Sequence, residues 1–313
     1  MSAASQKRPV VVIGGANMDL TGQAQSALIT GDSTPGAVLA TAGGVGRNIA
    51  EALARLERPT QLITALGDDG FAEDIARQTA VAGVDLRATL RVPERRSSTY
   101  LSVLEPTGEM RVAISDMALV SALSREVLED RRRDLEKAQA WVVDANLSED
   151  ALAYLFSIAD PDRPVYAEPV STTKALRLHP YLSQIALLKP NRIEAATLTG
   201  LQPDDAPADL IAALLHHGID RVVISDSAAG VWGQDAGGPL LHQPAALTRD
   251  IRSVTGAGDT LMAALVDATL ANLPLASALL RAQAAARLSL QSVRAIHPGL
   301  CQAAVQAELE RTL

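Results

Sequence analysis

The chain has 313 residues, with 28 Lys and Arg against 36 Asp and Glu, so its formal net charge at pH 7 is -8. An acidic surface repels phosphate backbones, which argues against nucleic acid as a partner. Hydrophobic residues make up 48% and charged residues 20%, which is typical of a globular protein and not of a disordered one. No uninterrupted apolar run reaches the roughly 18 residues of a membrane span, so no membrane partner is expected.

Two features predict the compartment. The first nine residues, MSAASQKRP, contain no long apolar stretch before a cleavage site, so no signal peptide is predicted. Cys301 is the only cysteine, so no disulfide can form within the chain, which is typical of a reducing compartment. We therefore expect a cytoplasmic protein.

Short apolar runs alternate with longer stretches of helical periodicity along the chain. Strands are predicted over residues 9–13, 61–66, 140–143, 165–167, 185–189 and 221–225. Helices are predicted over residues 48–56, 71–82, 150–158, 192–199, 208–217, 259–270 and 275–290. This alternation is typical of an α/β fold, with a mostly parallel central sheet and helices on both faces.

Two segments interrupt the alternation. Residues 19–42 are rich in Thr, Gly, Ser and Ala and lack helical periodicity, and residues 98–115 are typical of a hairpin with its turn at 106–108. We expect them to form a small β-sheet lid, spanning about 19–42 and 98–116. Since no internal repeat or low-complexity linker is present, residues 1–313 are predicted to form one domain with this lid.

The sequence Thr-Gly-Ala-Gly-Asp at residues 255–259 directly precedes an apolar helix. Small residues let the backbone approach a ligand, and N–H groups at a helix start form an anion site without basic side chains. Asp259 would stand inside this site, where it could act as a general base. The alternative is that Asp259 caps the helix; spacing alone favours capping, which leaves the preceding glycines less explained.

Two further glycine-rich turns are candidate ligand sites. Residues 43–48, Gly-Gly-Val-Gly-Arg-Asn, open a helix without following a clear strand; the alternative is a tight loop into that helix. Residues 14–19, Gly-Gly-Ala-Asn-Met-Asp, follow the first strand, and ligands bind beyond the carboxyl ends of parallel strands. Asp19 is suited there to hold a vicinal diol, or alternatively to form an Asx-type turn.

Asn191 and Glu194 lie three residues apart at the start of a predicted helix, so their side chains share one face. Oxygen ligands on one face suit Mg²⁺. The same pair is typical of a capping box, and on these residues alone capping is the preferred interpretation.

These four stretches, in this order, resemble the ribokinase (PfkB) family of carbohydrate and nucleoside kinases, over nearly the whole chain. Residues 43–48 and 255–259 match the two signature regions of the family, and residues 189–195, KPNRIEA, lie between them. Within the family, residues 32–56, 98–117 and 188–200 look closest to pseudouridine kinases, which phosphorylate the 5′-hydroxyl of a C-nucleoside. The resemblance implies a ribokinase-like fold and a kinase that uses ATP and Mg²⁺.

The resemblance also assigns roles to residues. Asp259 would be the catalytic base, and Gly256, Ala257 and Gly258 would supply a backbone anion hole for the transferring phosphoryl group. The implied substrate-binding residues are Asn17, Asp19, Gly43, Gly44, Asn48, Thr99, Asp116 and Asn146. The implied nucleotide-binding residues are Asn191, Ser225, Gly230, Thr255, Gly256 and Gly258, and the implied Mg²⁺ residues, acting through water, are Asn191 and Glu194.

Three positions depart from the family pattern. Ser253 stands where many relatives have an Asp that ligates an activating monovalent cation, so no such cation is assigned. Asp226 adds negative charge near the expected ATP site. Asn146 stands where ribokinase-like members place a Glu against the substrate, and an amide both donates and accepts hydrogen bonds.

The predicted function is phosphorylation of the 5′-hydroxyl of pseudouridine by ATP, giving pseudouridine 5′-phosphate and ADP. A kinase for ribose or another nucleoside is an alternative, because the ribose-binding residues are shared. A non-catalytic nucleoside-binding member of the fold is another, although a binder needs no base. A nicotinamide-dependent dehydrogenase is disfavoured by the incomplete glycine fingerprint. Exposed edges of a lid sheet invite a second chain, so a homodimer is expected.

Overall fold

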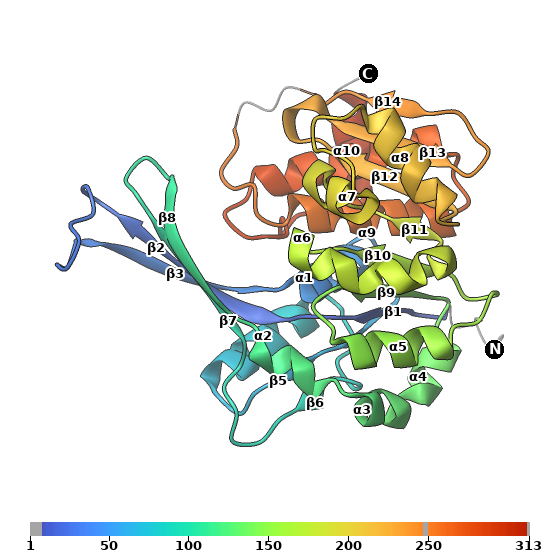
Figure 1. Ribbon diagram of the computed structural model, residues 1–313. Coiled ribbons are helices and arrows are strands. Elements are labelled where there is room, and N and C mark those ends of the chain that lie inside the picture. Colours follow the sequence, from blue (N-terminus) through green and yellow to red (C-terminus); the bar gives the residue numbers. More distant parts are fainter. Residues whose placement is uncertain (1–7, 247–249, 312–313) are drawn as a thin grey trace.

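The computed structural model describes residues 8–246 and 250–311. An eight-stranded sheet forms the centre of the fold (Figure 1). Its strands, in spatial order, are β14 (Leu241–Gln243), β13 (Val231–Asp235), β12 (Arg221–Ser225), β11 (Leu187–Leu188), β10 (Val165–Glu168), β9 (Ala140–Asp144), β1 (Val10–Ile13) and β4 (Thr60–Ile63). Neighbours from β12 to β4 are parallel, and β13 and β14 are antiparallel additions.

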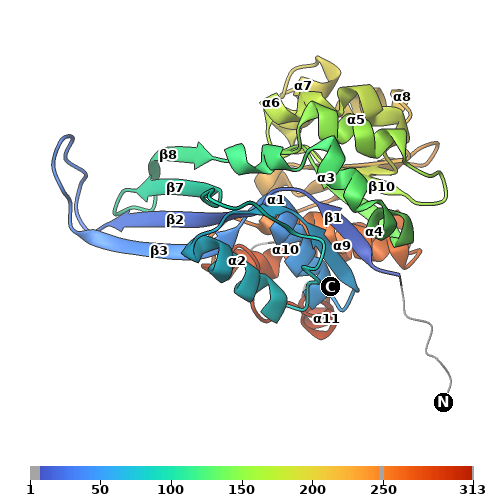
Figure 2. The ribbon, with the colours of Figure 1, turned by 90° about the horizontal axis from the view of Figure 1, so that it is seen from below.

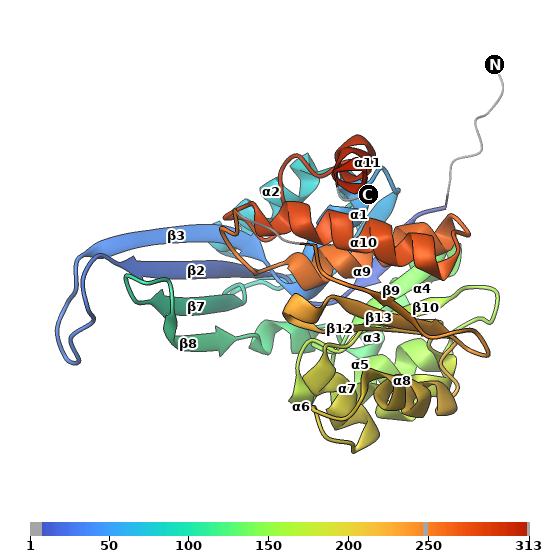
Figure 3. The ribbon, with the colours of Figure 1, turned by 90° about the horizontal axis from the view of Figure 1, so that it is seen from above.

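Helices cover both faces of this sheet (Figures 1 and 3). One face carries α1 (Val45–Arg55), α9 (Ala257–Leu270), α10 (Leu275–Leu290) and α11 (Gln302–Glu310). The other carries α3 (Arg125–Asp130), α4 (Arg132–Lys137), α5 (Glu149–Ser157), α6 (Thr172–Ala175), α7 (Arg192–Thr199) and α8 (Pro207–His216), with the 3₁₀ segments η1 (Ala118–Ala122) and η2 (Leu176–Gln184). A third 3₁₀ segment, η3 (Ser227–Ala229), joins β12 to β13.

The continuous apolar character of β1 follows from this layering. Val10 and Val12 belong to the core cluster on one face, whereas Val11 and Ile13 belong to the cluster on the other. Because side chains alternate along a strand, both sets must be apolar when both faces are covered. The α/β architecture predicted from the sequence, a mostly parallel central sheet with helices on both faces, is thus the one observed.

A separate four-stranded sheet, which we call the β-extension, projects beyond the main sheet and its helices (Figures 1 and 2). Its strands, in spatial order, are β3 (Gly36–Gly43), β2 (Asn17–Ala24), β7 (Thr99–Leu104) and β8 (Met110–Asp116). Helix α2 (Gly70–Val81) packs against its base, where Met18, Leu66 and Ile75 form a small third core cluster. The candidate site lies where this sheet joins the main domain.

Two sequence predictions of secondary structure were wrong. The strand predicted over residues 61–66 is two strands, because β5 (Ala65–Leu66) leaves the main sheet and pairs with β6 (Leu90–Arg91). The turn at residues 43–48 does follow a strand, β3. Most of β3 is exposed and built from small residues, so it lacks the apolar run that marks a buried strand.

Within residues 8–246 and 250–311, no helix combines the length and the apolar character needed to cross a lipid bilayer.

Candidate active site

The site forms where α1 and α9 begin side by side at one end of the main sheet. Asp259 lies in the first turn of α9 and accepts a hydrogen bond from Asn48 Nδ2 of α1 at 2.8 Å, across 211 positions of sequence. The N-cap of α9 is Gly256, and no backbone N–H of the described residues donates to the Asp259 carboxylate. The capping alternative for Asp259 is therefore wrong, because its carboxylate is directed to another helix.

The environment of Asp259 changes its acidity. Burial raises its pKa to about 6, although the hydrogen bond from Asn48 and the charge of Lys189 oppose the rise. The negative charges of Asp144 and Asp19 add to it. The residue still keeps part of its surface accessible to solvent. A carboxylate with a pKa just below neutrality is suited to accept a proton from a hydroxyl group.

The glycine turn before Asp259 has a conformation that requires glycine. Gly256 has a φ angle of 80°, and a Cβ at this position would overlap the carbonyl oxygen of Ala295. The first N–H groups of a helix have no partner inside the helix, so this turn presents donors and the positive end of a 14-residue helix dipole. A Cβ on Gly258 would lie 3.3 Å from Lys189 Nζ, which places this ammonium group beside the turn.

The second carboxylate of the site, Asp19, lies in β2. It accepts a hydrogen bond from Asn17 Nδ2 at 2.6 Å, and a Cβ on Gly43 would overlap the Asp19 carboxylate. Burial raises the pKa of Asp19, against the opposing effects of Asn17 and Arg47. The Asx-turn alternative is wrong, because Asp19 is paired within a strand and no turn forms there.

The turn into α1 is built by close backbone packing. Gly44 is the N-cap of α1 with a φ angle of 98°, and a Cβ there would overlap the backbone of Gly15 and Ala16. This packing places Asn48 one turn into the helix, with its amide directed at Asp259. Gly43, Gly44 and Asn48 are thus gathered around the two carboxylates.

The register of the β-extension separates Thr99 and Asp116 from Asp19. Thr99 pairs with Met18 on one side and with Asp116 on the other. Paired residues share a face and successive residues alternate, so Thr99 and Asp116 lie on the face of Met18 and not on that of Asp19. The sequence alone gave no means of assigning these faces.

Asn146 lies beside the turn after β1. A Cβ on Gly15 would lie 3.1 Å from Asn146 Nδ2, and Asn146 Oδ1 accepts a hydrogen bond from Lys174 Nζ at 2.6 Å. Lys174 therefore orients the amide, with Nδ2 on the side of Gly15.

On the nucleotide side, Asn191 and Glu194 form a complete capping box at the start of α7. Asn191 Oδ1 accepts from the Glu194 backbone N–H at 2.8 Å, and Glu194 Oε2 accepts from the Asn191 N–H at 2.9 Å. The capping interpretation is confirmed, and the Mg²⁺ role stays a prediction. Ser225 lies next to Asn191 through an isolated parallel bridge.

The remaining predicted nucleotide residues are placed as follows. Asp226 forms an ion pair with Arg192 at 2.7 Å, so its negative charge is compensated inside the protein. Gly230 has a φ of 97° and packs against the backbone at Gln243. Thr255 is exposed at the start of the glycine turn.

Comparison with known proteins identifies the family. Residues 7–300 match the pfkB family of carbohydrate kinases. The chain belongs to the PfkB family. It is 38% identical to a pseudouridine kinase of Escherichia coli (strain K12) over 307 residues, which is 97% of each protein.

Solved structures agree with this placement. A carbohydrate kinase from Agrobacterium tumefaciens has a TM-score of 0.83 and 30% identity, with 97% of each chain covered. A ribokinase of Arabidopsis thaliana, solved with ribose and ATP, has a TM-score of 0.84 at 22% identity, covering 97% of this chain and 99% of the other, and shares the fold. The protein is thus an ATP-dependent PfkB kinase with a ribokinase-like fold.

Sequence reasoning missed Asp144, the residue that holds the site of this PfkB kinase together. Its fully buried carboxylate accepts backbone N–H bonds from Gly15 and Gly46 at 2.8 Å each and from Asn146 at 2.9 Å. Burial raises its pKa, and these bonds oppose the rise. The signal was an acidic residue closing the otherwise apolar strand β9.

It also missed Lys189 and Glu168, which form a buried ion pair at 2.9 Å. Burial would lower the pKa of Lys189, but the charges of Glu168, Asp259 and Glu194 outweigh burial and raise it. Burial, with the charges of Glu194 and Asp259, raises the pKa of Glu168 to about 8, against the opposing charge of Lys189. Lys189 therefore stays charged. Charged residues ending buried strands were the available signal.

The donor set suits a divalent cation shared with phosphates. No group of three or more His, Cys, Asp or Glu residues capable of holding a metal ion occurs in the described part of the chain. Mg²⁺ in kinases is held by one or two carboxylates together with substrate phosphates and water. Glu194 is buried near the Lys189–Glu168 pair, where carboxylates outnumber the single ammonium group. The residues present therefore fit Mg²⁺ that arrives with a nucleotide.

Proposed function

We propose that this PfkB kinase transfers the γ-phosphoryl group of ATP to the 5′-hydroxyl of pseudouridine, with Asp259 as the base. The observation that carries the chemistry is Asp259, held by Asn48 beside the glycine turn at the start of α9. The acceptor is supported by 38% identity to the pseudouridine kinase of Escherichia coli over 97% of both proteins.

Proton removal belongs to Asp259. Asn48 occupies its Oδ2, which leaves Oδ1 for the acceptor hydroxyl. As the substrate oxygen forms its bond to the γ-phosphorus, its proton passes to Asp259, and the bond from phosphorus to the β-bridging oxygen breaks to release ADP. Such a transfer depends mainly on positioning and electrostatic stabilisation.

Two kinds of group would stabilise the negative charge that develops on the transferring phosphoryl group. The N–H groups of Gly256 and Gly258 are fixed by the turn, so they need no reorganisation during the reaction. The Ala257 N–H donates to the Val254 carbonyl at 3.4 Å and would have to leave it to join them. Lys189 adds a full positive charge beside Gly258. Mg²⁺, held by Glu194 and Asn191 through water, would neutralise the phosphate oxygens of ATP. Thr255, Ser225 and Gly230 would line the rest of the nucleotide site.

The acceptor is held by its ribose and by its base. Asp19, oriented by Asn17, suits a vicinal diol, and Gly43 and Gly44 let the sugar approach the backbone. Asn146 offers an amide to the base, since an amide can donate to a carbonyl and accept from a ring N–H. Thr99 and Asp116 lie on the face opposite Asp19, so in this proposal they belong to the lid without contacting the acceptor.

The test is coupled ADP release with Mg·ATP, comparing pseudouridine, uridine, ribose and adenosine. Uridine is the sharpest comparison, because pseudouridine differs from it by a carbon–carbon glycosidic bond and one added ring N–H. A kcat/KM at least tenfold higher for pseudouridine supports the proposal. A preference for ribose or adenosine would retire the acceptor and keep the kinase chemistry. No turnover with any acceptor would favour a non-catalytic binding protein.

Asn146→Leu tests the contact with the base. The variant keeps the side-chain size but removes both hydrogen-bonding groups. If the amide contacts the base, the pseudouridine preference over uridine falls, whereas turnover of ribose is unchanged. An unchanged preference would exclude Asn146 from acceptor selection.

The β-extension also supports the proposed homodimer. Register places Val38, Leu101, Val112 and Ile114 on one face of this sheet, and all four are exposed. Such a contiguous apolar face marks an interaction site, and a second copy of the chain offers the same face.

A further inference from the structure

Tyr100 of β7 differs from the other aromatic residues of the chain. The sequence contains two Trp, four Tyr and two Phe, and all of them lie in the described part of the structure. The other seven belong to the three hydrophobic core clusters or pack against them: Phe71, Trp141, Tyr154, Phe156, Tyr166, Tyr181 and Trp232. Tyr100 is in none of these clusters and is partly exposed. Core packing therefore does not explain its aromatic ring.

The register of the β-extension places Tyr100 beside Asp19. Asp19 pairs with Thr41 of β3 on one side and with Tyr100 of β7 on the other. Tyr100 in turn pairs with Ser115 of β8. Because paired residues share a face of the sheet, these four side chains form a row on the face that carries the Asp19 carboxylate. The apolar face proposed for the dimer is the opposite one.

The Tyr100 ring is held at its outer end and lies next to small side chains. Its hydroxyl donates a hydrogen bond to Met110 Sδ at 3.7 Å. The residues of β8 that share its face nearby are Ser115 and Ala113, and both are too small to cover an aromatic ring. The ring therefore offers an apolar surface directly beside the polar group that suits a ribose diol.

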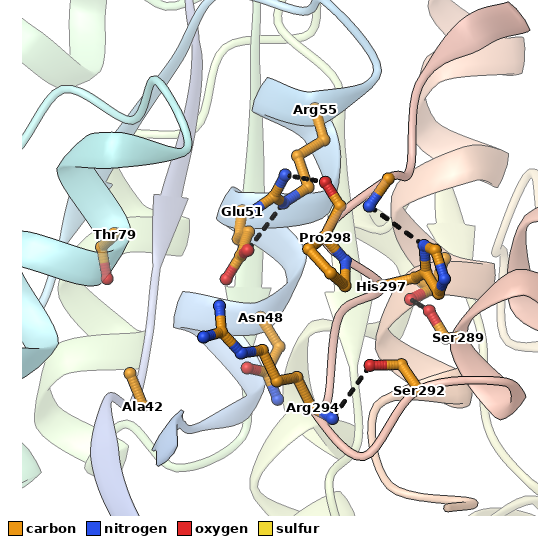
Figure 4. Close-up of polar contacts among 12 residues, drawn as sticks. Ala42, Asn48, Glu51, Arg55, Thr79, Ser289, Ser292, Arg294, His297 and Pro298 are labelled. Carbon is orange, nitrogen blue, oxygen red and sulfur yellow. Dashed lines mark hydrogen bonds and ion pairs between the residues drawn. The ribbon is translucent and has the colours of Figure 1, made fainter. Parts of the chain in front are cut away.

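The strand on the other side of Asp19 leads to the phosphoryl-transfer site. β3 ends at Gly43, and a Cβ there would overlap the Asp19 carboxylate. The chain continues into α1, whose Asn48 binds Asp259. Figure 4 shows Ala42 of β3 close to the helix that carries Asn48. With the diol on Asp19 and the 5′-hydroxyl at Asp259, the 5′ end of the ribose lies on the β3 side.

The base must then lie on the side of β7 and β8. In a ribofuranose ring, the carbon that bears the base and the carbon that bears the 5′-hydroxymethyl group flank the vicinal diol on opposite sides. The position of Asn146 agrees with this direction. A Cβ on Gly15 would lie 3.1 Å from both Asn146 Nδ2 and Met117 Cε, and Met117 directly follows β8. The Asn146 amide and the Tyr100 ring thus flank the same end of the acceptor.

A planar nucleobase presents a π-face, and aromatic side chains bind such faces by stacking. We propose that the base of the acceptor stacks on Tyr100, so that this residue makes the site select nucleosides over free sugars. The inference rests on the proposed function, because it takes the diol to Asp19 and the 5′-hydroxyl to Asp259. Tyr100 contacts no reacting atom, so it contributes to acceptor binding and not to phosphoryl transfer.

The test is calorimetric titration of the full chain with pseudouridine and with ribose, in the presence of a non-hydrolysable Mg·ATP analogue. Tyr100→Ala is expected to weaken pseudouridine binding about tenfold or more, while the affinities for ribose and for the ATP analogue stay unchanged, because only the nucleoside has a base to stack. Pseudouridine affinity equal to that of the parent would overturn the proposal. An equal loss for pseudouridine and the ATP analogue would also overturn it, since it would show a general defect of the fold.

Two further variants separate stacking from support of the sheet. Tyr100→Phe keeps the ring and should retain pseudouridine affinity within about threefold of the parent. Val103→Ala is the matched control, because it shortens a side chain of the same strand on the opposite face. It should leave pseudouridine binding unchanged. If Tyr100→Phe binds as weakly as Tyr100→Ala, or if Val103→Ala binds as weakly, Tyr100 does not act through its ring and the proposal fails.

Titrations with uridine and adenosine distinguish this inference from the proposed acceptor. A parent chain that binds one of them more tightly than pseudouridine would retire pseudouridine as the acceptor. Loss of that binding in Tyr100→Ala would still support stacking, because every nucleobase has a π-face. A parent chain that binds no nucleoside would overturn both.

Discussion

Asp259 has to meet two opposing requirements at once. As a base it must be ionised near neutral pH, yet protein atoms and the charges of Asp144 and Asp19 favour its neutral form. Asn48 and Lys189 partly offset this by stabilising the ionised form. The result is a pKa of about 6, which leaves the carboxylate ionised at pH 7 but more basic than an exposed Asp.

The pH dependence of turnover follows from this value. Below about pH 6 Asp259 is protonated and cannot accept the hydroxyl proton, so kcat/KM is expected to be roughly tenfold lower at pH 5 than on its plateau. The hydrogen bond from Asn48 lowers the pKa of Asp259. Its removal in Asn48→Ala should therefore raise this pKa and move the acid limb of the kcat/KM profile to higher pH. A profile that stays flat down to pH 5 would exclude Asp259 as the base.

Asp259→Asn separates function from stability. Turnover is expected to fall on the order of 1,000-fold, within the usual range for a general base. A rise in pKa from 3.8 to about 6 means that the folded state disfavours the ionised form. Protonated Asp259 therefore stabilises the fold; this stabilisation is fully present below pH 3.8 and is lost as pH rises through about 6. Because Asp259→Asn cannot ionise, its free energy of unfolding at pH 8 should exceed that of the parent by about 1–3 kcal/mol.

Urea unfolding of Asp259→Asn measures this gain. Asp204→Asn, at an exposed position, is the control and should leave both turnover and the free energy of unfolding near those of the parent. If Asp259→Asn keeps normal turnover, the base lies elsewhere. If it destabilises the fold at pH 8, the carboxylate is stabilised by contacts stronger than those described here.

At the scale of elements, the site depends on where helices begin. The starts of α1 and α9 are both glycine turns with positive φ, at Gly44 and Gly256, and each packs against another stretch of backbone. At α1 the first N–H groups are used inside the protein, because Gly46 donates to Asp144 and Arg47 donates to the Gly15 carbonyl. At α9 no side chain caps the helix, so the N–H of Gly258 is left for a ligand. The start of α7 is different, because the Asn191–Glu194 capping box closes it.

Gly256→Ala tests this dependence at α9. The new Cβ would overlap the Ala295 carbonyl, so the turn must move, and we expect loss of at least 90% of turnover together with a lower melting temperature. Gly237→Ala is the matched control: its φ is also positive, at 74°, but nothing lies near the added Cβ. That variant should lose only about 1–2 kcal/mol of stability and keep its turnover. Equal effects would mean that backbone strain alone matters.

At the scale of the whole molecule, the β-extension is the part that the rest of the chain covers least. Its outer strands carry apolar side chains in water, with Ile114 62% exposed and Val38 77% exposed. α2 covers only the base of the sheet. A second copy packed on this face would remove that surface from water and hold the two extensions in place.

Ile114→Asp tests the dimer. A charge on the apolar face should shift the protein from dimer to monomer in sedimentation velocity at micromolar concentration. Ala113→Asp adds the same charge to the opposite face of the same strand and should leave the dimer intact. A parent chain that sediments as a monomer, or equal dissociation in both variants, would reject this interface.

Local sequence was enough for much of the fold. Alternating apolar runs predicted the parallel sheet, and the turn at residues 255–259 placed Asp259 at a helix start, because periodicity and turn chemistry depend on residues a few positions apart. The exposed strand β3 was missed, and β5 was predicted as part of the main sheet, because exposure and strand partners depend on residues far apart in the sequence.

The sequence by itself determined the fold class, the order of the glycine turns and the carboxylate offered as base. Only the tertiary structure decided what surrounds that carboxylate: Asn48 from 211 positions away, Lys189 with Glu168, and the Asp144 carboxylate that joins two turns. The fold likewise brings together four arginines from α1, α2 and the loop after α10: Arg47, Arg55, Arg77 and Arg294. Hydrogen bonds, burial and charge act between neighbours in space, and the fold alone sets which residues those are.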